Sequence, residues 1–180
     1  MGEKLDTLRQ FVRTTILEGI LREAVTGGDR LHLSPRPLTL ENIKEVPPHQ
    51  QIQTFKKPRG LWYSCGDSWK NFSEEELDRS TANLYQYRLK IDHGQMLVIS
   101  SVEEFEAFQN SQYTKQGKLE VEIDWPAVAR DYAGIEICPY RSEMRDHLDK
   151  FWYYTWDVAS GVIWKPSAIL SLDLISEPNQ

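Results

Sequence analysis

The stretch YQYRLKIDHGQMLVIS, residues 85–100, holds the most regular alternation in the sequence. Every second side chain from Tyr85 to Ile91 is apolar, and this period of two is typical of a strand with one buried face. The polar turn signal Asp92-His93-Gly94 and a second apolar run, Met96–Ile99, follow directly. The stretch therefore predicts a β-hairpin in a fold that contains a sheet.

Further strands and helices are predicted on both sides of this hairpin. Short apolar or alternating runs bounded by Gly or Pro predict strands at 31–34, 60–64, 135–138 and 170–175. Helical spacing or capping residues predict helices at 4–25, 39–46, 102–110 and 125–132, and a short one that starts at the capping box of Ser73. This order favours an α+β fold around a mixed or antiparallel sheet. The 180 residues fit a single domain, 1–180, with an N-terminal helix in 1–28 and a core over 29–175.

The aromatic-rich segment FWYYTWDVASGVIW, residues 151–164, is the second strong signal. Bulky aromatic side chains at successive positions predict a central strand covered on both faces, with Trp152, Tyr154 and Trp156 on one of them. Residues 157–161 are expected to form a turn or bulge, because they end on a glycine. The chain has six tryptophans, and either a dense core or an aromatic-lined pocket explains them.

Composition limits the classes of function. The formal charge of −6 argues against a general nucleic-acid or anionic-membrane surface, but it leaves room for a local basic pocket. Two cysteines without C-x-x-C spacing predict reduced thiols rather than a disulfide scaffold. The four histidines form no pair at metal-ligand spacing, so no metal site is expected. The sequence shows no signal peptide or membrane span, and the expectation is a cytoplasmic protein without membrane partners.

The order of the predicted segments resembles that of the ADP-ribosyltransferase fold, especially its small phage and bacterial members. The segments that carry the resemblance are, in chain order, the strand at 31–34, Gly60–Ser64, the hairpin at 85–99, Asp131–Ile137 and Val162–Ile169. Several members of that type carry a Tyr-Asp-Gly-Ile strand and end on a strand that reads Val-Val-Phe-Asp-Pro-Ser-x-Ile. The tryptophan-rich part of 151–164 also resembles a pattern in phage-type proteins. The similarity covers about residues 29–170 and implies that NAD is a substrate.

The resemblance assigns roles to residues of two predicted strands. His32 stands where the family has a His or Arg that contacts the adenosine part of NAD, and Ser34 faces the same side of the strand. Tyr63 and Ser64 stand where the family has the Tyr or Ser that stacks on nicotinamide or orders the site. Trp62 or Trp69 is expected beside Tyr63 on the nicotinamide side. The expected cofactor-binding residues are thus His32, Ser34, Trp62, Tyr63, Ser64 and Trp69.

The implied reaction breaks the bond between ribose and nicotinamide through an oxocarbenium-like cation. A carboxylate fixed beside that ribose stabilises the cation more than the ground state, and the family has a Glu for this at the start of a late strand. Here Ser160 falls at that position, Asp157 precedes it, and no Glu occurs between Glu143 and Glu177. Either Asp157 takes the role of the acid or the site binds without transfer. The expected catalytic residues are Asp157, Ser160 and Tyr63.

Three functions from different classes of protein remain open on these grounds. The leading expectation is an NAD-dependent ADP-ribosyltransferase that modifies a host macromolecule, either a protein or a nucleic acid. The alternative is a non-catalytic interaction or inhibitor protein that keeps the same fold, which the absent Glu and the acidic charge favour. A third is a carbohydrate-binding site built from the tryptophans. A change of tryptophan fluorescence on addition of NAD separates the first function from the second.

Overall fold

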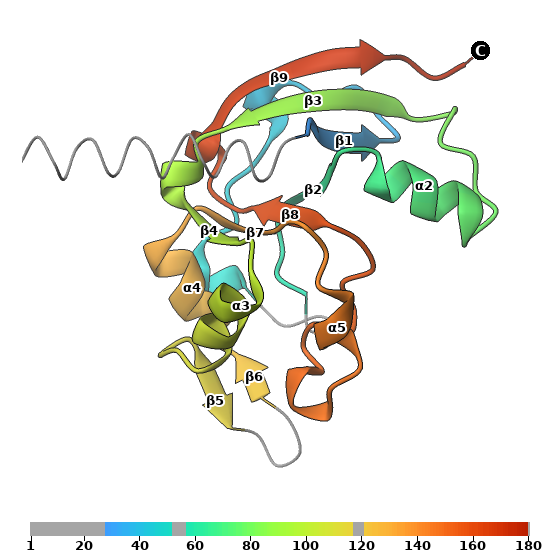
Figure 1. The fold of residues 1–180 in the computed structure, drawn as a ribbon. Helices are drawn as coiled ribbons and strands as arrows, with labels where there is room; N and C mark the ends of the chain where they lie inside the picture. The colour runs from blue at the N-terminus through green and yellow to red at the C-terminus, as the bar shows by residue number, and fades with distance from the viewer. Residues whose placement is uncertain (1–27, 52–56, 117–120, 180) are drawn as a thin grey trace, which may run out of the picture.

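The computed structural model describes residues 28–51, 57–116 and 121–179. Within them, short helices and strands follow one another irregularly, and a large mixed sheet forms the body of the molecule (Figure 1). The α+β class expected from the sequence is therefore confirmed. The helix predicted at 4–25 lies outside the described residues. In the described ranges, no helix has the length and apolar character needed to cross a membrane.

The main sheet contains seven strands in the order β4-β7-β8-β2-β1-β3-β9. Its members are β1 (Arg30–Ser34), β2 (Leu61–Cys65), β3 (Tyr85–Ile91), β4 (Met96–Ile99), β7 (Gly134–Ile137), β8 (Ser160–Ile163) and β9 (Ile169–Ser176). Neighbouring strands pair antiparallel, except that β4 and β7 run parallel. A separate small sheet, which the sequence patterns did not predict, consists of β5 (Thr114–Gln116) and β6 (Val121–Ile123). The strands that carry most of the expected site residues, β1 and β2, are therefore direct neighbours.

The hairpin predicted at residues 85–99 is wrong, although both of its strands exist. β3 pairs with β1 and β9, whereas β4 pairs with β7 at the opposite edge of the sheet. The connection is a 3-10 turn, His93–Gln95, in which the Asp92 carboxylate accepts a hydrogen bond from the Gly94 amide. Such a turn does not return a strand along its neighbour, as the two-residue turns of hairpins do. The local turn signal was correct, but it does not determine which strands pair.

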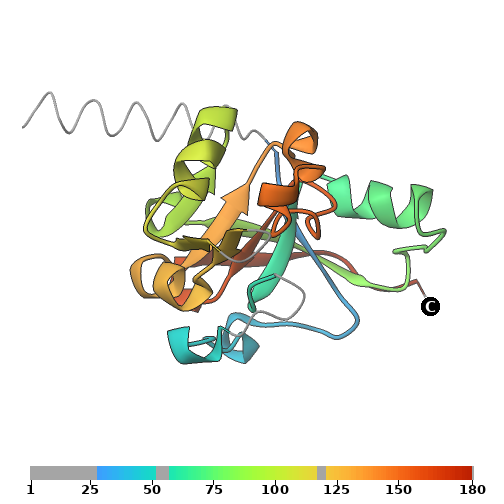
Figure 2. The ribbon, with the colours of Figure 1, turned by 90° about the horizontal axis from the view of Figure 1, so that it is seen from below.

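The helices are α2 (Ser68–Glu75), α3 (Val102–Gln109), α4 (Trp125–Asp131) and α5 (Ser142–Arg145). In Figure 1, α3, α4 and α5 lie below β7 and β8, while α2 lies apart from them, beside β1 and β2. Figure 2 shows the same separation of α2 from α3 and α4 from another side. α3 and α4 begin at their predicted caps, because the side chains of Ser101 and Asp124 accept hydrogen bonds from amides of the first turn.

Two helix predictions near the N-terminal half are wrong in their bounds. Ser73 does not start a helix; it lies inside α2, and its hydroxyl donates to the Arg79 carbonyl. The helix expected over 39–46 is reduced to a 3-10 turn, Leu40–Asn42, because the Thr39 side chain makes no capping hydrogen bond. Sequence patterns of this kind locate helices better than they locate helix ends.

Two apolar clusters cover the two faces of the sheet. Neighbouring residues of a strand point to opposite faces, and accordingly Val162 of β8 belongs to the larger cluster while Ile163 belongs to the smaller one. The larger cluster includes residues of α3 and α4 and most of the tryptophans. The smaller cluster contains Tyr63 and apolar residues of β3 and β4. Of the expected site residues on β1 and β2, Tyr63 belongs to the smaller cluster and Trp62 packs against the larger one.

The central strand predicted at residues 151–156 is wrong. This segment forms consecutive turns, in which the Trp156 amide donates to the Tyr153 carbonyl, and the strand β8 begins only at Ser160. Tyr153 and Trp156 are fully buried, whereas Phe151 and Tyr154 are exposed. A run of aromatic residues predicts burial, but its burial pattern here follows the turns and not the alternation of a strand.

The expectation of reduced thiols is also wrong, because Cys65 and Cys138 form a disulfide. Cys65 ends β2 and Cys138 directly follows β7, and these two strands flank β8 on either side. The cysteines are 73 residues apart in the sequence, so only the strand order brings them together. Disulfides persist mainly in oxidising compartments, and this one is the feature of the fold that bears on the cellular compartment.

Candidate functional site

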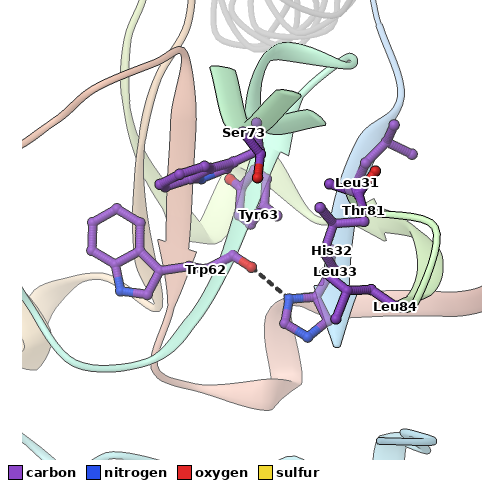
Figure 3. Close-up of a pocket in the computed structure, with 9 residues that line it drawn as sticks. Leu31, His32, Leu33, Trp62, Tyr63, Ser73, Thr81 and Leu84 are labelled. Atoms are coloured by element: carbon purple, nitrogen blue, oxygen red, sulfur yellow. Dashed lines mark hydrogen bonds between the residues drawn. The ribbon is translucent and has the colours of Figure 1, made fainter. Parts of the chain in front are cut away.

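A cavity of about 260 Å³, here named the aromatic cavity, lies among residues of β1, β2 and α2 (Figure 3). Nine residues line it: Leu31, His32, Leu33, Trp62, Tyr63, Trp69, Ser73, Thr81 and Leu84. Of the residues expected from the sequence to bind a cofactor, His32, Trp62, Tyr63 and Trp69 belong to this set, and Ser34 and Ser64 do not.

Three segments build the aromatic cavity. β1 and β2 form adjoining walls because they pair antiparallel. α2 follows β2 closely and packs against it, and Trp69 and Ser73 are four positions apart on the same face of this helix. The loop before β3 contributes Thr81 and Leu84. The close-up in Figure 3 shows Ser73 on the helix above the cavity and His32 with Trp62 across it.

His32 is one of the residues that line the aromatic cavity, and its ring is held by a hydrogen bond to β2. Its Nδ1 lies 2.7 Å from the carbonyl oxygen of Trp62, and since a carbonyl only accepts, Nδ1 must carry the proton of this bond. Burial lowers the pKa of His32 below its ordinary value, more than the bond to Trp62 raises it. The imidazole is therefore neutral at pH 7, and its Nε2 is an acceptor for an N–H or O–H group of a ligand.

Tyr63 connects the aromatic cavity to a buried charge cluster. Its hydroxyl donates to Glu136 Oε2 at 2.9 Å, and the Arg30 guanidinium binds both oxygens of the same carboxylate at 3.1 and 2.8 Å. His93 Nε2 lies 3.3 Å from Glu136 Oε2. Burial and the Glu136 charge raise the pKa of Tyr63, so the phenol stays protonated and keeps donating. We name Arg30, Tyr63, His93 and Glu136 the Glu136 cluster.

Glu136 is ionised although it has no exposed surface. Burial on its own raises the pKa of Glu136, but the hydrogen bonds from His93 and Arg30 and the charge of Arg30 outweigh it and lower the pKa to about 2. Such a carboxylate needs these partners, because an unpaired buried charge costs several kcal/mol. The Glu136 cluster therefore holds Tyr63 in one orientation.

Gly161 makes the link between Tyr63 and Glu136 possible. β8 lies between β2 and β7, and Gly161 pairs with Tyr63 on one side and with Glu136 on the other. A Cβ atom on Gly161 would lie 2.3 Å from Cζ and Oη of Tyr63. Only glycine leaves the Tyr63 ring room to cross β8 and reach the carboxylate.

No sequence pattern indicated the Glu136 cluster. Glu136 lies in Gly134–Ile137, which reads as an apolar strand, and all four of these residues are buried. The signal in the sequence was a single acid within an apolar strand. A carboxylate buried in this way must be paired or hydrogen-bonded, so it indicates that partners exist without identifying them. The partners are distant in sequence, Arg30 by 106 residues and Tyr63 by 73, so they are visible only in the fold.

Asp157, the expected catalytic acid, lies outside the set that lines the aromatic cavity. Its carboxylate faces Lys57 Nζ at 3.4 Å and Arg145 Nη2 at 3.5 Å. Lys57 Nζ in turn lies 5.4 Å from the ring centre of Trp62, which does line the cavity. Asp157 is thus connected to the cavity through Lys57 and the Trp62 indole, on the side where Trp62 also packs against Trp156.

The expected serines have local hydrogen bonds. The hydroxyl of Ser160 donates to the Val158 carbonyl, and this buried residue pairs with Ser64 across β2 and β8. The Ser64 hydroxyl is shared between the carbonyls of Leu31 and Gly66. The hydroxyl of Ser34 donates to the Arg36 carbonyl. These bonds fix the ends of the strands that carry the site.

One group of possible metal ligands comes together in the described residues. The sulfur atoms of Cys65 and Cys138 and a carboxylate oxygen of Glu136 lie within 4.8 Å of one another. The two sulfurs are joined in the disulfide, and Glu136 is ion-paired with Arg30, so the group offers no thiolate to a metal.

Comparison with known protein families, with curated proteins and with solved structures finds no match for this chain. The function must therefore be argued from the aromatic cavity and its surroundings.

Proposed function

We propose that this protein binds NAD in the aromatic cavity and transfers the ADP-ribose part to a host macromolecule, either a protein or a nucleic acid. The observation that carries the proposal is the convergence of His32, Trp62 and Trp69 on one cavity. His32 was expected on the ligand from the sequence resemblance and the two tryptophans because they lie near Tyr63, and the three residues come from β1, β2 and α2. Each of these three residues has a chemical property that suits the binding of a nicotinamide ring.

The aromatic cavity suits a flat ring with one polar edge. Indole faces bind planar rings by stacking, and a positively charged nicotinamide ring gains additional attraction from the indole electrons. The neutral His32 presents an acceptor that fits the amide N–H of nicotinamide. The remaining wall is largely apolar, through Leu31, Leu33 and Leu84. A site of this composition orients a ring by a few polar contacts and binds it by its faces.

Transfer requires a carboxylate near the ribose; the resemblance places Ser160 at the position of the family's acid, and Asp157, three residues earlier, takes that role in this proposal. Lys57 and Arg145 form ion pairs with the Asp157 carboxylate, and Lys57 connects it to the Trp62 side of the cavity. A charge fixed in this way stabilises a cationic transition state without reorganisation. The proposed site of action is the cytoplasm, where NAD is available, and the Cys65–Cys138 disulfide is the observation that weighs against this compartment.

A second candidate function is NAD binding without transfer. The specific observation that favours it is the lining of the aromatic cavity, in which none of the nine residues carries a carboxylate. In that case the protein binds NAD without reacting with it and, with a net charge of −6, interacts with a partner through an acidic surface.

One experiment separates the two candidates. The protein is titrated with NAD while tryptophan fluorescence is followed, and the same mixtures are assayed for free nicotinamide. We expect fluorescence quenching and nicotinamide release, and we expect both to be lost in His32→Ala and Trp69→Ala. Phe151→Ala is the matched control, since this exposed aromatic residue stacks on Tyr154, outside the set that lines the cavity. Quenching without release supports binding alone, and the absence of both refutes the NAD proposal.

A further inference from the structure

A second cavity of about 220 Å³, here named the polar cavity, adjoins the aromatic cavity. The two share the lining residues Leu33, Thr81 and Leu84, and we name the pair of cavities the groove. The polar cavity is also lined by the side chains Lys70, Glu74, Gln86, Ser176, Glu177 and Asn179. These come from α2, β3 and the segment at and after the end of β9.

The two ends of the groove differ in chemistry. The first end is built from indole and leucine side chains, and the second from carboxylates, amides, a hydroxyl and one ammonium group. Glu74 and Glu177 outnumber the single cation Lys70, so the charge of the polar end disfavours a phosphate group. Carboxylates and amides together suit uncharged groups that donate several hydrogen bonds, as the hydroxyls of a sugar do. A ligand that fills the groove thus has a flat ring at one end and a polyhydroxylated part at the other.

Glu74 lines the polar cavity and is an exposed residue of α2. Its Oε1 accepts a hydrogen bond from Thr81 Oγ1 at 3.0 Å, and Thr81 is a buried residue that lines both cavities. This bond fixes the carboxylate on the wall of the groove while using one of about four acceptor positions of the group. A fixed carboxylate binds two adjacent hydroxyls, as acidic residues do with the ribose of dinucleotides.

We propose that the groove binds a nucleoside, with the base in the aromatic cavity and the ribose hydroxyls on the Glu74 carboxylate. The proposal gives Glu74 a ligand-binding role that the sequence patterns did not indicate. It rests on the proposed NAD site only for the identity of the base as nicotinamide. The sugar site itself follows from the shared walls and from the chemistry of the polar cavity.

The test compares ligands that differ by the sugar alone. Nicotinamide riboside and 1-methylnicotinamide carry the same positive charge on the ring, and only the first has ribose. Their affinities are measured by calorimetry on the wild type, on Glu74→Gln and on Glu75→Gln. Glu75 is the matched control, because it is the next residue of α2, is exposed as Glu74 is, lies outside the set that lines the polar cavity, and its substitution changes the charge equally.

We expect the riboside to bind the wild type at least tenfold more tightly than 1-methylnicotinamide. Glu74→Gln should remove most of this difference while it changes the affinity for 1-methylnicotinamide less than twofold, and Glu75→Gln should leave both affinities unchanged. Equal binding of the two ligands to the wild type overturns the sugar site, as does an undiminished riboside affinity in Glu74→Gln.

A panel of adenosine, guanosine, cytidine and uridine separates this inference from the proposed function. If one of these nucleosides binds in a manner that depends on Glu74, while NAD and nicotinamide riboside do not bind, the sugar site stands and the nicotinamide assignment fails. If neither the riboside nor any nucleoside of the panel binds the wild-type protein, the inference is wrong.

Discussion

The tryptophans of this protein fall into two regions with different surroundings. Trp152, Trp156 and Trp164 each retain about 1% of their surface exposed and pack in the large apolar cluster. Trp62 and Trp69 are half-buried and present part of their surface to the aromatic cavity. The comparison shows that the number of aromatic residues in a segment does not distinguish a core from a binding wall. What distinguishes them is whether every face of the ring is covered, and only the fold determines that.

The largest expected effect tests the core region. Trp156→Ala should lower the free energy of unfolding by about 3–5 kcal/mol, because it leaves a cavity where a fully buried indole packs against Trp62 and Tyr153. Trp156→Phe should cost much less, since the indole N–H of Trp156 has no hydrogen-bond partner in the part of the chain that the structure describes. Chemical denaturation followed by circular dichroism measures both. A loss below about 1 kcal/mol for Trp156→Ala would mean that this region is not a packed core.

The next effect concerns the Glu136 cluster behind Tyr63. The pKa of Glu136 is lowered from 4.5 to about 2, so its ion pair stabilises the fold above pH 4.5, and this contribution is lost as the pH falls from 4.5 to 2. The shift corresponds to about 3 kcal/mol. Unfolding free energies between pH 6 and pH 2 should therefore fall more steeply for the wild type than for Glu136→Gln.

The same variant provides a second measurement at neutral pH. Glu136→Gln removes the carboxylate charge that the buried Arg30 guanidinium contacts through two hydrogen bonds, and this is expected to destabilise the protein at pH 7. Parallel pH profiles for the wild type and the variant would show that Glu136 is not the titrating group. The Glu136 cluster would then not be what orients Tyr63.

A smaller effect on stability is expected in the cavity region. Trp69→Ala should lower the free energy of unfolding by only about 1 kcal/mol, because the indole is half-buried and its aromatic contact is the edge-to-face one with Phe72. The same change should weaken NAD binding at least tenfold, since it removes a wall of the aromatic cavity. Calorimetry with NAD and a denaturation curve measure the two quantities on one sample. A loss of stability as large as that of Trp156→Ala would remove the distinction between the two regions.

Local signals in the sequence predicted the parts of the fold that short segments determine. The caps at Ser101 and Asp124 form as predicted, and the alternation over 85–91 is indeed a strand. The pairing of that strand was not predictable, because the turn at His93–Gln95 leads the chain to the far side of the sheet. The same limit explains the missed Cys65–Cys138 disulfide, whose geometry depends on the positions of β2 and β7 on either side of β8.

The candidate site was likewise predictable from the sequence only in part. The sequence resemblance named His32, and Trp62 and Trp69 were expected because they lie near Tyr63. The three line one cavity because β1 pairs with β2 and α2 packs against β2. Glu74 and Thr81 were not named, although their hydrogen bond forms a wall of the groove. Their sequence context reads as a solvated helix and a loop, and only the position of α2 beside β1 and β2 gives them a common cavity.

The smallest effect on stability is expected for Asp157→Asn. The carboxylate of Asp157 is one quarter exposed, and its ion pairs with Lys57 and Arg145 are long, at 3.4 and 3.5 Å. Pairs of this kind contribute roughly 0–1 kcal/mol, so the unfolding free energy should change by less than about 1 kcal/mol. If Asp157 is the acid of the reaction, the same variant should nevertheless lose nicotinamide release by at least a hundredfold, since it removes charge and keeps volume.

Comparison of Asp157→Asn with Glu74→Gln assigns the acid to one end of the groove or the other. Asp157 reaches the aromatic cavity only through Lys57 and Trp62, whereas Glu74 lies on the groove itself through Thr81. Loss of release in Asp157→Asn, with riboside affinity unchanged, supports catalysis from the Trp62 side. Full release in Asp157→Asn together with lost release in Glu74→Gln would move the catalytic role to α2. Asp157 would then be a structural residue that keeps Lys57 over the Trp62 ring, and the cavity region would contain the whole of the reaction.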